Sequence, residues 1–233
     1  MLFRNQSNSS KLELRILLPA FITIVCVLAF IYIANLIILN KTGNFDDWIL
    51  LSLRDPQNKF QPIGPKWLKE TMINITSLGS AAIITLFTIV IVGYLLFQKN
   101  YWFIFVILLA TIGGAILVFV LKDFFGRERS DLVPHLVYAA SYSFPSGHST
   151  MSAVVYLTQA SLISKIQKKG SIKTYILIVA LILTFLIGIS RVYLGVHYPT
   201  DVLAGWALGL AWASICLIIN NYFEKSRTKN LKF

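Results

Sequence analysis

The chain has 233 residues, of which 56% are of the apolar and aromatic types and only 13% are charged, and its mean hydropathy is +0.70. Soluble globular domains carry about 25% charged residues. The composition therefore excludes an ordinary water-soluble domain, because too few charges are present to cover a surface in water, and it indicates an integral membrane protein. The length fits a single membrane-embedded domain, 1–233.

The formal net charge is +11, from 21 Lys and Arg residues against 10 Asp and Glu residues. These cations lie in short connections between apolar segments, so membrane lipids and an anionic substrate are better partners than nucleic acid. The two cysteines, Cys26 and Cys216, fall within apolar segments. Their spacing fits neither a disulfide framework nor a zinc site, and no metal site is predicted.

Six apolar segments are candidates for transmembrane helices, each of which needs ~20 residues. In chain order they cover about 16–39, 76–97, 102–121, 149–163, 174–190 and 202–219. The fourth is short and contains Ser, Thr and Gln, so we expect it to pack inside the bundle. The first is too long for a signal peptide and is interpreted as a retained anchor. The predicted fold class is all-α, a polytopic membrane helical bundle with six transmembrane helices.

The longest connection, 40–75, contains Trp48, Trp67 and three prolines beside short apolar runs. We expect it to form an interfacial helix that lies along the outer surface with tryptophan at the level of the headgroups. A role in substrate gating is the alternative.

An even number of spans places both chain ends on one side of the membrane. The ends and the connections on their side carry 12 Lys and Arg residues, and the opposite connections carry 9. Four of those 9 lie in 122–148 and 191–201, among the polar clusters described next, where they have another use. When these four are set aside, the ratio is 12 to 5. The positive-inside rule then predicts a multi-pass protein of the cell inner (plasma) membrane with cytoplasmic termini.

Three polar clusters stand where the apolar pattern stops. They are KDFFGRER at 122–129, PSGH at 145–148, and Ser190-Arg191 followed by His197 and Asp201. The connections that hold them open on the same side of the membrane if the span count is right. We therefore expect all three clusters to meet at the outer or periplasmic face. The remaining histidine, His135, is interpreted as a solvated loop residue.

The clusters contain three cations that suit a tetrahedral phosphate, namely Lys122, Arg129 and Arg191. If Ser146 and Gly147 open a helix, they add free backbone N–H groups and the positive end of the helix dipole. Nearby carboxylates would neutralise part of this charge. Together these groups predict a cradle for a phosphoryl transition state.

Two histidines supply candidate acid–base and nucleophilic groups. A neutral imidazole attacks phosphorus when a second group orients it, and Asp201 follows His197 by four residues. The carboxylate would accept the Nδ1 proton of His197, and His148 would then protonate the leaving group. The sequence leaves open which imidazole carries the proton.

Each of these residues taken alone has an ordinary explanation. A cation at the end of a span usually reaches out to lipid headgroups, and a lone histidine near a helix end usually packs or caps. Such explanations do not account for three clusters of these types on one face, so the pattern favours a functional site.

The spacing Lys122-x6-Arg129, then PSGH, then Ser190-Arg191-x5-His197-x3-Asp201 resembles the three-part signature of the type 2 phosphatidic acid phosphatase (PAP2) family, in its membrane lipid phosphatase branch. The resemblance covers about 122–201 closely and the six-span layout loosely. It implies metal-independent hydrolysis without a cofactor, through a phosphohistidine intermediate.

The resemblance also implies a role for each matching residue. His197 corresponds to the nucleophile, Asp201 to its partner and His148 to the acid. The remaining matches correspond to the phosphate cradle: Lys122, Arg129, Ser146, Gly147 and Arg191. One position departs from the family, because Ser130 stands where proline usually follows the arginine. Arg127 is the alternative cradle residue if the alignment is shifted.

Several functions share this signature. Soluble vanadate-dependent haloperoxidases have a similar cradle, but six apolar spans argue against them. The remaining candidates are phosphatases of undecaprenyl diphosphate, phosphatidylglycerol phosphate or phosphatidic acid, with lipid A phosphatases as an alternative. A lipid phosphotransferase with the same site stays open, as does the oligomeric state. An anion transporter is disfavoured because mid-span segments are almost free of charge.

Overall fold

The structure is a computed structural model that describes residues 2–230, with side chains from Arg15 to Glu224. Its elements in chain order are α1 (Leu2–Ile38), α2 (Gly43–Ser52), α3 (Lys66–Ser77), α4 (Ala81–Phe97), α5 (Tyr101–Phe125), α6 (Gly147–Ser152), a π-helical segment (Ala153–Leu157), α7 (Thr158–Ile166), α8 (Gly170–Tyr193) and α9 (Pro199–Asn230). The all-α class is confirmed.

Within the described residues, four helical segments are long and apolar enough to cross a membrane by themselves. They are Arg15–Ile38, Tyr101–Phe125, Gly170–Tyr193 and Pro199–Glu224. A fifth candidate is the pair α3 and α4, which bends by 51° at a short break. The predicted span at about 76–97 takes in the end of α3, the break and the whole of α4. The chain is a multi-pass membrane protein with four to five such candidates.

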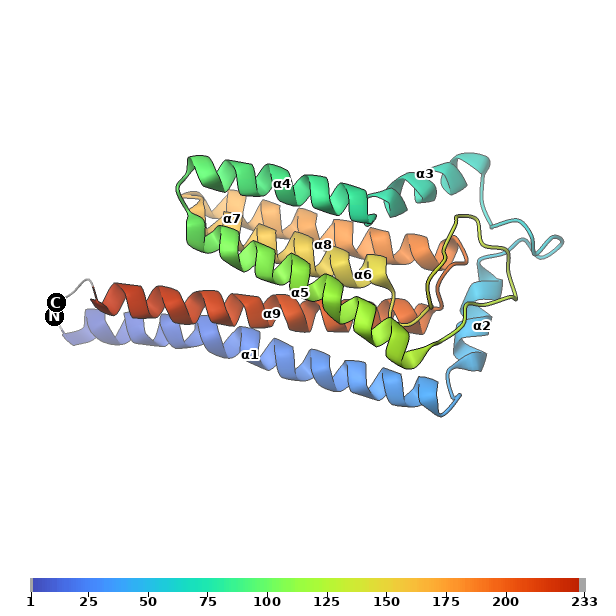
Figure 1. The fold of residues 1–233 in the computed structure, drawn as a ribbon, viewed down its shortest axis with the longest axis horizontal. Helices are drawn as coiled ribbons and strands as arrows, with labels where there is room; N and C mark the ends of the chain where they lie inside the picture. The colour runs from blue at the N-terminus through green and yellow to red at the C-terminus, as the bar shows by residue number, and fades with distance from the viewer. Residues whose placement is uncertain (1, 231–233) are drawn as a thin grey trace.

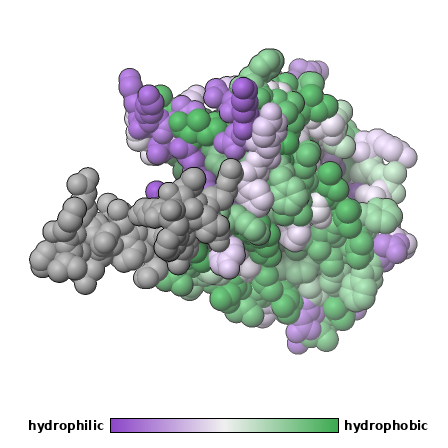
Figure 2. Space-filling model, turned by 60° about the vertical axis from the view of Figure 1, so that its left-hand side comes forward, coloured by the Kyte–Doolittle hydropathy of each residue, from purple (hydrophilic) through white to green (hydrophobic). Residues whose placement is uncertain are grey.

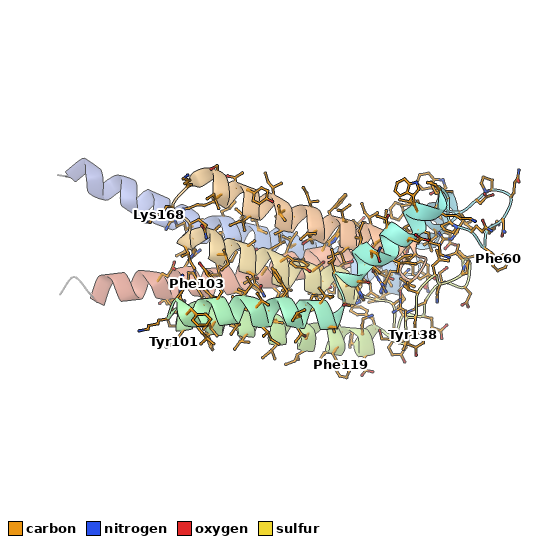
Figure 3. All side chains as sticks on the ribbon, turned by 90° about the horizontal axis from the view of Figure 1, so that it is seen from above. Phe60, Tyr101, Phe103, Phe119, Tyr138 and Lys168 are labelled. Carbon is orange, nitrogen blue, oxygen red and sulfur yellow. The ribbon has the colours of Figure 1, made fainter. Side chains whose placement is uncertain are left out.

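The helices run side by side, and the two ends of the bundle differ (Figure 1). Helix α1 lies along α9, and both chain termini are at the same end. Helix α2, most of α3 and the loop 126–146 are gathered at the other end. Figure 3 shows the same polarity, with Tyr101 and Lys168 near one end and Phe60 and Tyr138 near the other.

The sides of the bundle are apolar. Large side chains such as Phe21, Phe119 and Phe185 are exposed on α1, α5 and α8, and most of the face in Figure 2 is hydrophobic, with hydrophilic residues in separate groups. In a bilayer these side chains contact lipid and not water. The core between the helices contains Val154, Leu162 and other buried apolar residues.

Two glycines bring α9 into backbone contact with α6. A Cβ atom at Gly205 would lie 2.9 Å from the carbonyl oxygen of Ser146, and one at Gly209 would lie 2.6 Å from that of Thr150. Only a residue without a side chain leaves room for such an approach. The two helix starts that carry PSGH and Asp201 are thereby held together.

The connection 40–75 is not one interfacial helix. It forms α2, a loop over 53–65 and α3, because prolines at 56, 62 and 65 interrupt the helical pattern. Trp48 and Trp67 are exposed, at 68% and 63%. The predicted aromatic exposure is present, but the segment consists of two helices, and the second continues into the bent pair.

Candidate active site

The predicted site residues lie at helix ends and, for Arg129 and His197, in the adjoining connections. Figure 1 places these helix ends on the side away from the chain termini. Lys122 is in the last turn of α5 and Arg191 in the last turn of α8. Ser146 caps α6, which Gly147 and His148 begin. His197 lies in the short connection before α9, and Asp201 in the first turn of that helix.

Local caps direct the chain into the site. Helix α5 is capped by Gly126, whose left-handed backbone (φ +56°) suits glycine and whose N–H donates to the carbonyl of Lys122. At the start of α6, the hydroxyl of Ser146 accepts from the N–H of Ser149 at 3.4 Å. The backbone N–H of Ser146 donates to the carbonyl of Asp201 at 3.1 Å. The PSGH segment is thus bonded directly to the first turn of α9.

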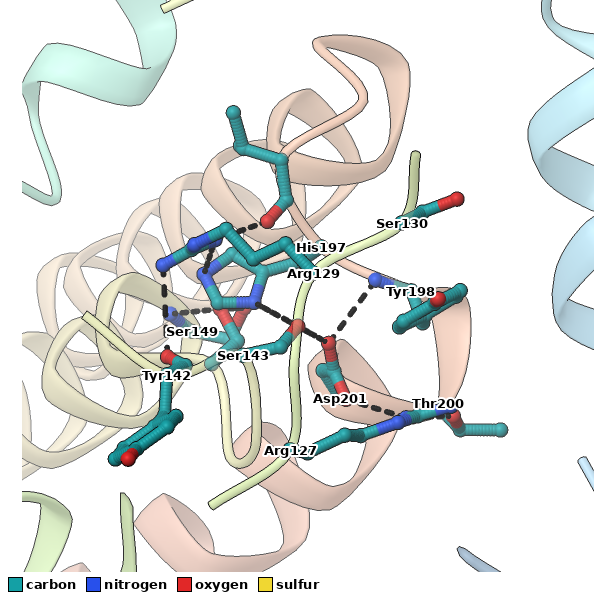
Figure 4. Close-up of polar contacts among 12 residues, drawn as sticks. Arg127, Arg129, Ser130, Tyr142, Ser143, Ser149, His197, Tyr198, Thr200 and Asp201 are labelled. Atoms are coloured by element: carbon teal, nitrogen blue, oxygen red, sulfur yellow. Dashed lines mark hydrogen bonds and ion pairs between the residues drawn. The ribbon is translucent and has the colours of Figure 1, made fainter. Parts of the chain in front are cut away.

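The two ring nitrogens of His197 face different groups (Figure 4). Nδ1 lies 3.4 Å from Oδ2 of Asp201, and Nε2 lies 3.4 Å from Nη1 of Arg129. The same carboxylate oxygen accepts from the backbone N–H of Tyr198 at 3.0 Å and from the hydroxyl of Ser143. The carboxylate therefore orients the ring so that Nε2 faces the cations.

The imidazole of His197 is buried, with 3% of the residue exposed. Burial lowers its pKa from 6.5 to about 3, with a smaller contribution from Arg191 and Arg129, although the hydrogen bond and the charge of Asp201 oppose this shift. The ring is consequently neutral at physiological pH, and a neutral ring has a free lone pair for attack.

The three predicted cations are held by backbone and hydroxyl oxygens. Lys122 donates to the carbonyl of Tyr142, and Arg129 donates to the carbonyls of Ser141, at 2.9 Å, and Val196. Burial also lowers the pKa of Arg129, against the effect of Asp201.

Arg191 is bonded differently from the other two cations. It is 4% exposed and donates to the hydroxyl of Thr76 at 2.9 Å. Its Nε has no hydrogen-bond partner among the described residues. A buried guanidinium N–H without an acceptor is unfavourable, so this group has a donor available for an anion.

The remaining predicted residues adjoin these cations. A Cβ atom at Gly147 would lie 3.6 Å from Cε of Lys122. His148 packs against Gly79, at the α3–α4 break, and it interacts electrostatically with Arg191, Lys122 and Arg129. The structure thus brings the eight predicted residues together, while their chemical roles stay predictions.

A cavity of about 540 Å³ opens beside two of the cations. It is lined by Lys122 and Arg129, by the acidic residues Asp123 and Glu128, and by Phe119 and Tyr142 among others. Lys122 and Arg129 are thereby accessible from this cavity.

Sequence reasoning missed several residues around the site, and the structure changes the account of Arg127. This arginine pairs with Asp46 and Asp201 at 2.9 and 2.6 Å, so it binds carboxylates and does not take the place of Arg129. The missed contacts are made by Thr42, Asp46, Thr76, Ser143 and Thr200. Asp46 is adjacent to Asp47 in sequence, and no pattern distinguishes the buried carboxylate from its neighbour.

The departure at Ser130 is compensated locally. Ser130 is buried, and its hydroxyl accepts from the backbone N–H of Leu132 at 3.2 Å. Its carbonyl contacts Nε2 of His135 at 3.0 Å. These contacts fix the turn that proline would stiffen, while His135 is an exposed loop residue, as expected.

Comparisons with known families and known proteins point to the same class of protein. The model of the PAP2 superfamily matches residues 103–225. Phosphatidylglycerophosphatase B of Bacillus subtilis is 40% identical over 160 residues, which cover 68% of this chain and 77% of that protein. Lipid A 1-phosphatase of Rhizobium johnstonii is 31% identical over 115 residues, 46% of this chain and 43% of that protein.

The fold has a solved counterpart. A crystal structure of a transmembrane PAP2-type phosphatidylglycerolphosphate phosphatase from Bacillus subtilis superposes with a TM-score of 0.75 at 33% identity, covering 87% of this chain and 96% of that one. Fold and site define a membrane phosphatase whose cations and histidines meet at one end of a helical bundle. The chain belongs to the PAP2 superfamily, and the predicted membership in its membrane lipid phosphatase branch is confirmed.

Proposed function

We propose that this enzyme hydrolyses the terminal phosphomonoester of phosphatidylglycerol phosphate, with His197 as nucleophile. The observation that carries the chemistry is the orientation of one ring, whose Nδ1 faces Asp201 while Nε2 faces Arg129. The choice of lipid is supported by the matches to phosphatidylglycerophosphatase B and to the phosphatidylglycerolphosphate phosphatase structure of Bacillus subtilis, which cover more of this chain than the match to the lipid A 1-phosphatase does.

In the first step, the lone pair on Nε2 of His197 attacks phosphorus and the bond from phosphorus to the lipid oxygen breaks. Asp201 stabilises the resulting positive charge on the ring through Nδ1–H. His148 gives its proton to the departing alkoxide. Lys122, Arg129, Arg191 and the N–H groups that follow Ser146, including that of Gly147, stabilise the negative charge on the transferring oxygens.

In the second step, a water molecule attacks the phosphohistidine and the P–N bond breaks. His148, now neutral, accepts a proton from that water, so the reaction ends with free phosphate, a neutral His197 and a protonated His148. Transfer to a lipid acceptor in place of water would make the enzyme a phosphotransferase. Phosphate release without an added acceptor favours the hydrolase.

We propose that the whole chain, 1–233, is one membrane-embedded domain with its motif core at about 122–201. The span that completes the set of six, and the fourth in chain order, is the run of α6, the π-helical segment and α7, which is packed among other helices and contains the predicted segment 149–163. The count of Lys and Arg supports cytoplasmic termini. The site then faces the outer or periplasmic side of the plasma membrane.

Other lipids remain candidates for the same site: undecaprenyl diphosphate, phosphatidic acid and lipid A. A panel of these lipid phosphates, supplied in detergent micelles to the purified enzyme with EDTA present, separates them. We expect phosphatidylglycerol phosphate to give the highest kcat/KM. A higher value with lipid A or a diphosphate would contradict the proposed substrate, and loss of activity in EDTA would contradict metal-independent chemistry.

The non-enzymatic alternative, an anion transporter, has a direct test. The variant His197→Ala is expected to lose phosphate release from every lipid. Uptake of phosphate into vesicles that persists in this variant would favour transport.

A further inference from the structure

The guanidinium of Arg127 is shared between two buried carboxylates. Nη1 lies 2.6 Å from Oδ1 of Asp201, and Nη2 lies 2.9 Å from Oδ2 of Asp46. Both carboxylates are fully buried, whereas 15% of the arginine side chain is exposed. Burial of a carboxylate is strongly unfavourable unless it is paired and hydrogen-bonded. Arg127 is the cation that pairs with both.

Asp46 reaches from α2 to the first turn of α9. Its Oδ1 accepts from the backbone N–H of Thr200 at 3.0 Å, and its Oδ2 accepts from the hydroxyl of Thr200 at 2.7 Å. Because Thr200 immediately precedes Asp201, these bonds fix the backbone that carries the catalytic carboxylate.

Further contacts hold the arginine itself. Nη2 donates to the hydroxyl of Thr42 at 3.3 Å, and the guanidinium lies over the ring of Tyr198, 4.1 Å from its centroid. Although burial alone would lower it, the charges of Asp201 and Asp46 raise the pKa of Arg127. The guanidinium therefore stays charged and has little freedom to move. Figure 4 shows it beside Asp201 and Thr200.

The charges of this cluster are complementary to the reaction. Two carboxylates and one guanidinium leave one negative charge, which Oδ2 of Asp201 presents to Nδ1 of His197 at 3.4 Å. That charge is balanced when the ring becomes positive on taking up the phosphoryl group. Asp46 also limits how strongly Arg127 withdraws charge from Asp201.

We propose that Arg127 and Asp46 are positioning residues for the phosphoryl transfer. Arg127 holds Asp201 so that Oδ2 faces His197, and Asp46 holds Arg127 and offsets part of its charge. This inference rests on the proposed function and extends the working site to α2, a helix outside the three-part motif and outside the match to the superfamily at 103–225.

The test compares the wild type with Arg127→Lys, Asp46→Asn and the control Asp47→Asn. Asp47 is the adjacent, partly exposed residue of the same helix, and its replacement removes the same charge. We expect the first two variants to lower kcat on the order of 10- to 100-fold, the range found when a residue that orients a metal-bound histidine is replaced. KM and the inhibition constant of inorganic phosphate should stay within about 3-fold, because the cradle is untouched. The control should keep wild-type kinetics.

A second comparison asks whether the effect acts through Asp201. In the background of Asp201→Asn, measured with the activated monoester para-nitrophenyl phosphate, Asp46→Asn should change kcat by less than about 2-fold, because residues that act as a unit are not additive. A merely structural ion pair would lower kcat by the same factor in both backgrounds, and that result would overturn the proposal.

Folding is controlled with a charge-balanced variant. Asp46→Asn/Arg127→Gln removes one charge of each sign, and its thermal unfolding is compared with that of the wild type. A low kcat at a wild-type unfolding temperature supports the proposal, whereas recovery of wild-type kcat overturns it. Wild-type kcat in both single variants overturns it as well. Absence of phosphate release by the wild-type enzyme from every lipid would instead contradict the proposed function.

Discussion

The hydroxyl of Thr76 accepts a hydrogen bond of 2.9 Å from Nη1 of Arg191, 115 residues away in sequence. Both residues are buried, and Thr76 lies in the last turn of α3, directly before the break that separates this helix from α4. The bent helix pair therefore supports a cradle residue, although no part of it belongs to the three-part motif.

Replacement of this hydroxyl should weaken phosphate binding. Thr76→Val keeps the shape of the side chain but leaves Nη1 of Arg191 without its acceptor. A hydrogen bond to a charged group contributes about 1.5–3 kcal/mol, so we expect KM to rise about 10-fold or more. Thr71→Val, which removes a hydroxyl that donates to the backbone of its own helix, is the control. Equal KM values in the two variants would contradict this role of Thr76.

The α3–α4 break should also be sensitive to side-chain size. A Cβ atom at Gly79 would lie 2.6 Å from Cγ2 of Ile187 and 3.1 Å from Cδ2 of His148. We expect Gly79→Ala to displace the proposed acid and to lower kcat about 10-fold or more, because small misplacements of a catalytic group are costly. Gly93→Ala is the matched control, since a Cβ atom there has nothing within 4 Å. Unchanged kcat in Gly79→Ala would show that the α3–α4 break accommodates the added methyl group without displacing His148.

Ser143 should support the carboxylate partner of the nucleophile. Its hydroxyl donates to Oδ2 of Asp201 and lies 3.5 Å from Nδ1 of His197. Ser143→Ala removes a donor to a buried charge, which contributes about 1.5–3 kcal/mol. We expect kcat to fall about 10-fold with little change in KM, while Ser141→Ala, an exposed neighbour, keeps wild-type kinetics. A change in KM alone would assign Ser143 to substrate binding.

The stability of the enzyme should depend on pH through His197. Burial lowers the pKa of this ring from 6.5 to about 3, so between these values the unfolded chain binds a proton that the folded chain does not. The contribution of the neutral ring is therefore fully present above pH 6.5 and is lost as the pH falls towards 3. The free energy of unfolding should decline by up to about 1.4 kcal/mol per pH unit in this range through His197.

Thermal unfolding of the wild type and of His197→Gln between pH 7 and pH 5 measures this effect. The wild type should lose more stability on acidification than the variant, in which that titration is absent. Parallel curves would show that His197 does not contribute to the pH dependence.

Much of the fold followed from apolar segment lengths. Tyr101–Phe125 and Gly170–Tyr193 contain the predicted spans 102–121 and 174–190 and extend them by several residues. Lys122 and Arg191 consequently lie inside the last turns of helices, whereas the hydropathy pattern ended before each of them. Apolar content marks the part of a helix in lipid and does not mark where its hydrogen bonding stops.

The site was predictable where residues cluster in sequence and was not where they meet only in space. His148, His197 and Asp201 belong to motifs with fixed spacing, so their convergence was expected. Asp46 lies in the connection 40–75, which was expected to form an interfacial helix, and Thr76 lies at the start of the predicted span 76–97. Their contacts depend on how α2 and α3 pack against α9 and α8, and local sequence carries no signal for that packing.

A search for phosphate on His197 during turnover tests the proposed mechanism directly. Purified enzyme is mixed with phosphatidylglycerol phosphate, denatured within the turnover time and digested under alkaline conditions for mass spectrometry. We expect an acid-labile phosphate on the peptide that contains His197, and none in His197→Ala. Wild-type phosphate release by His197→Ala, or labelling of another residue in the wild type, would contradict it.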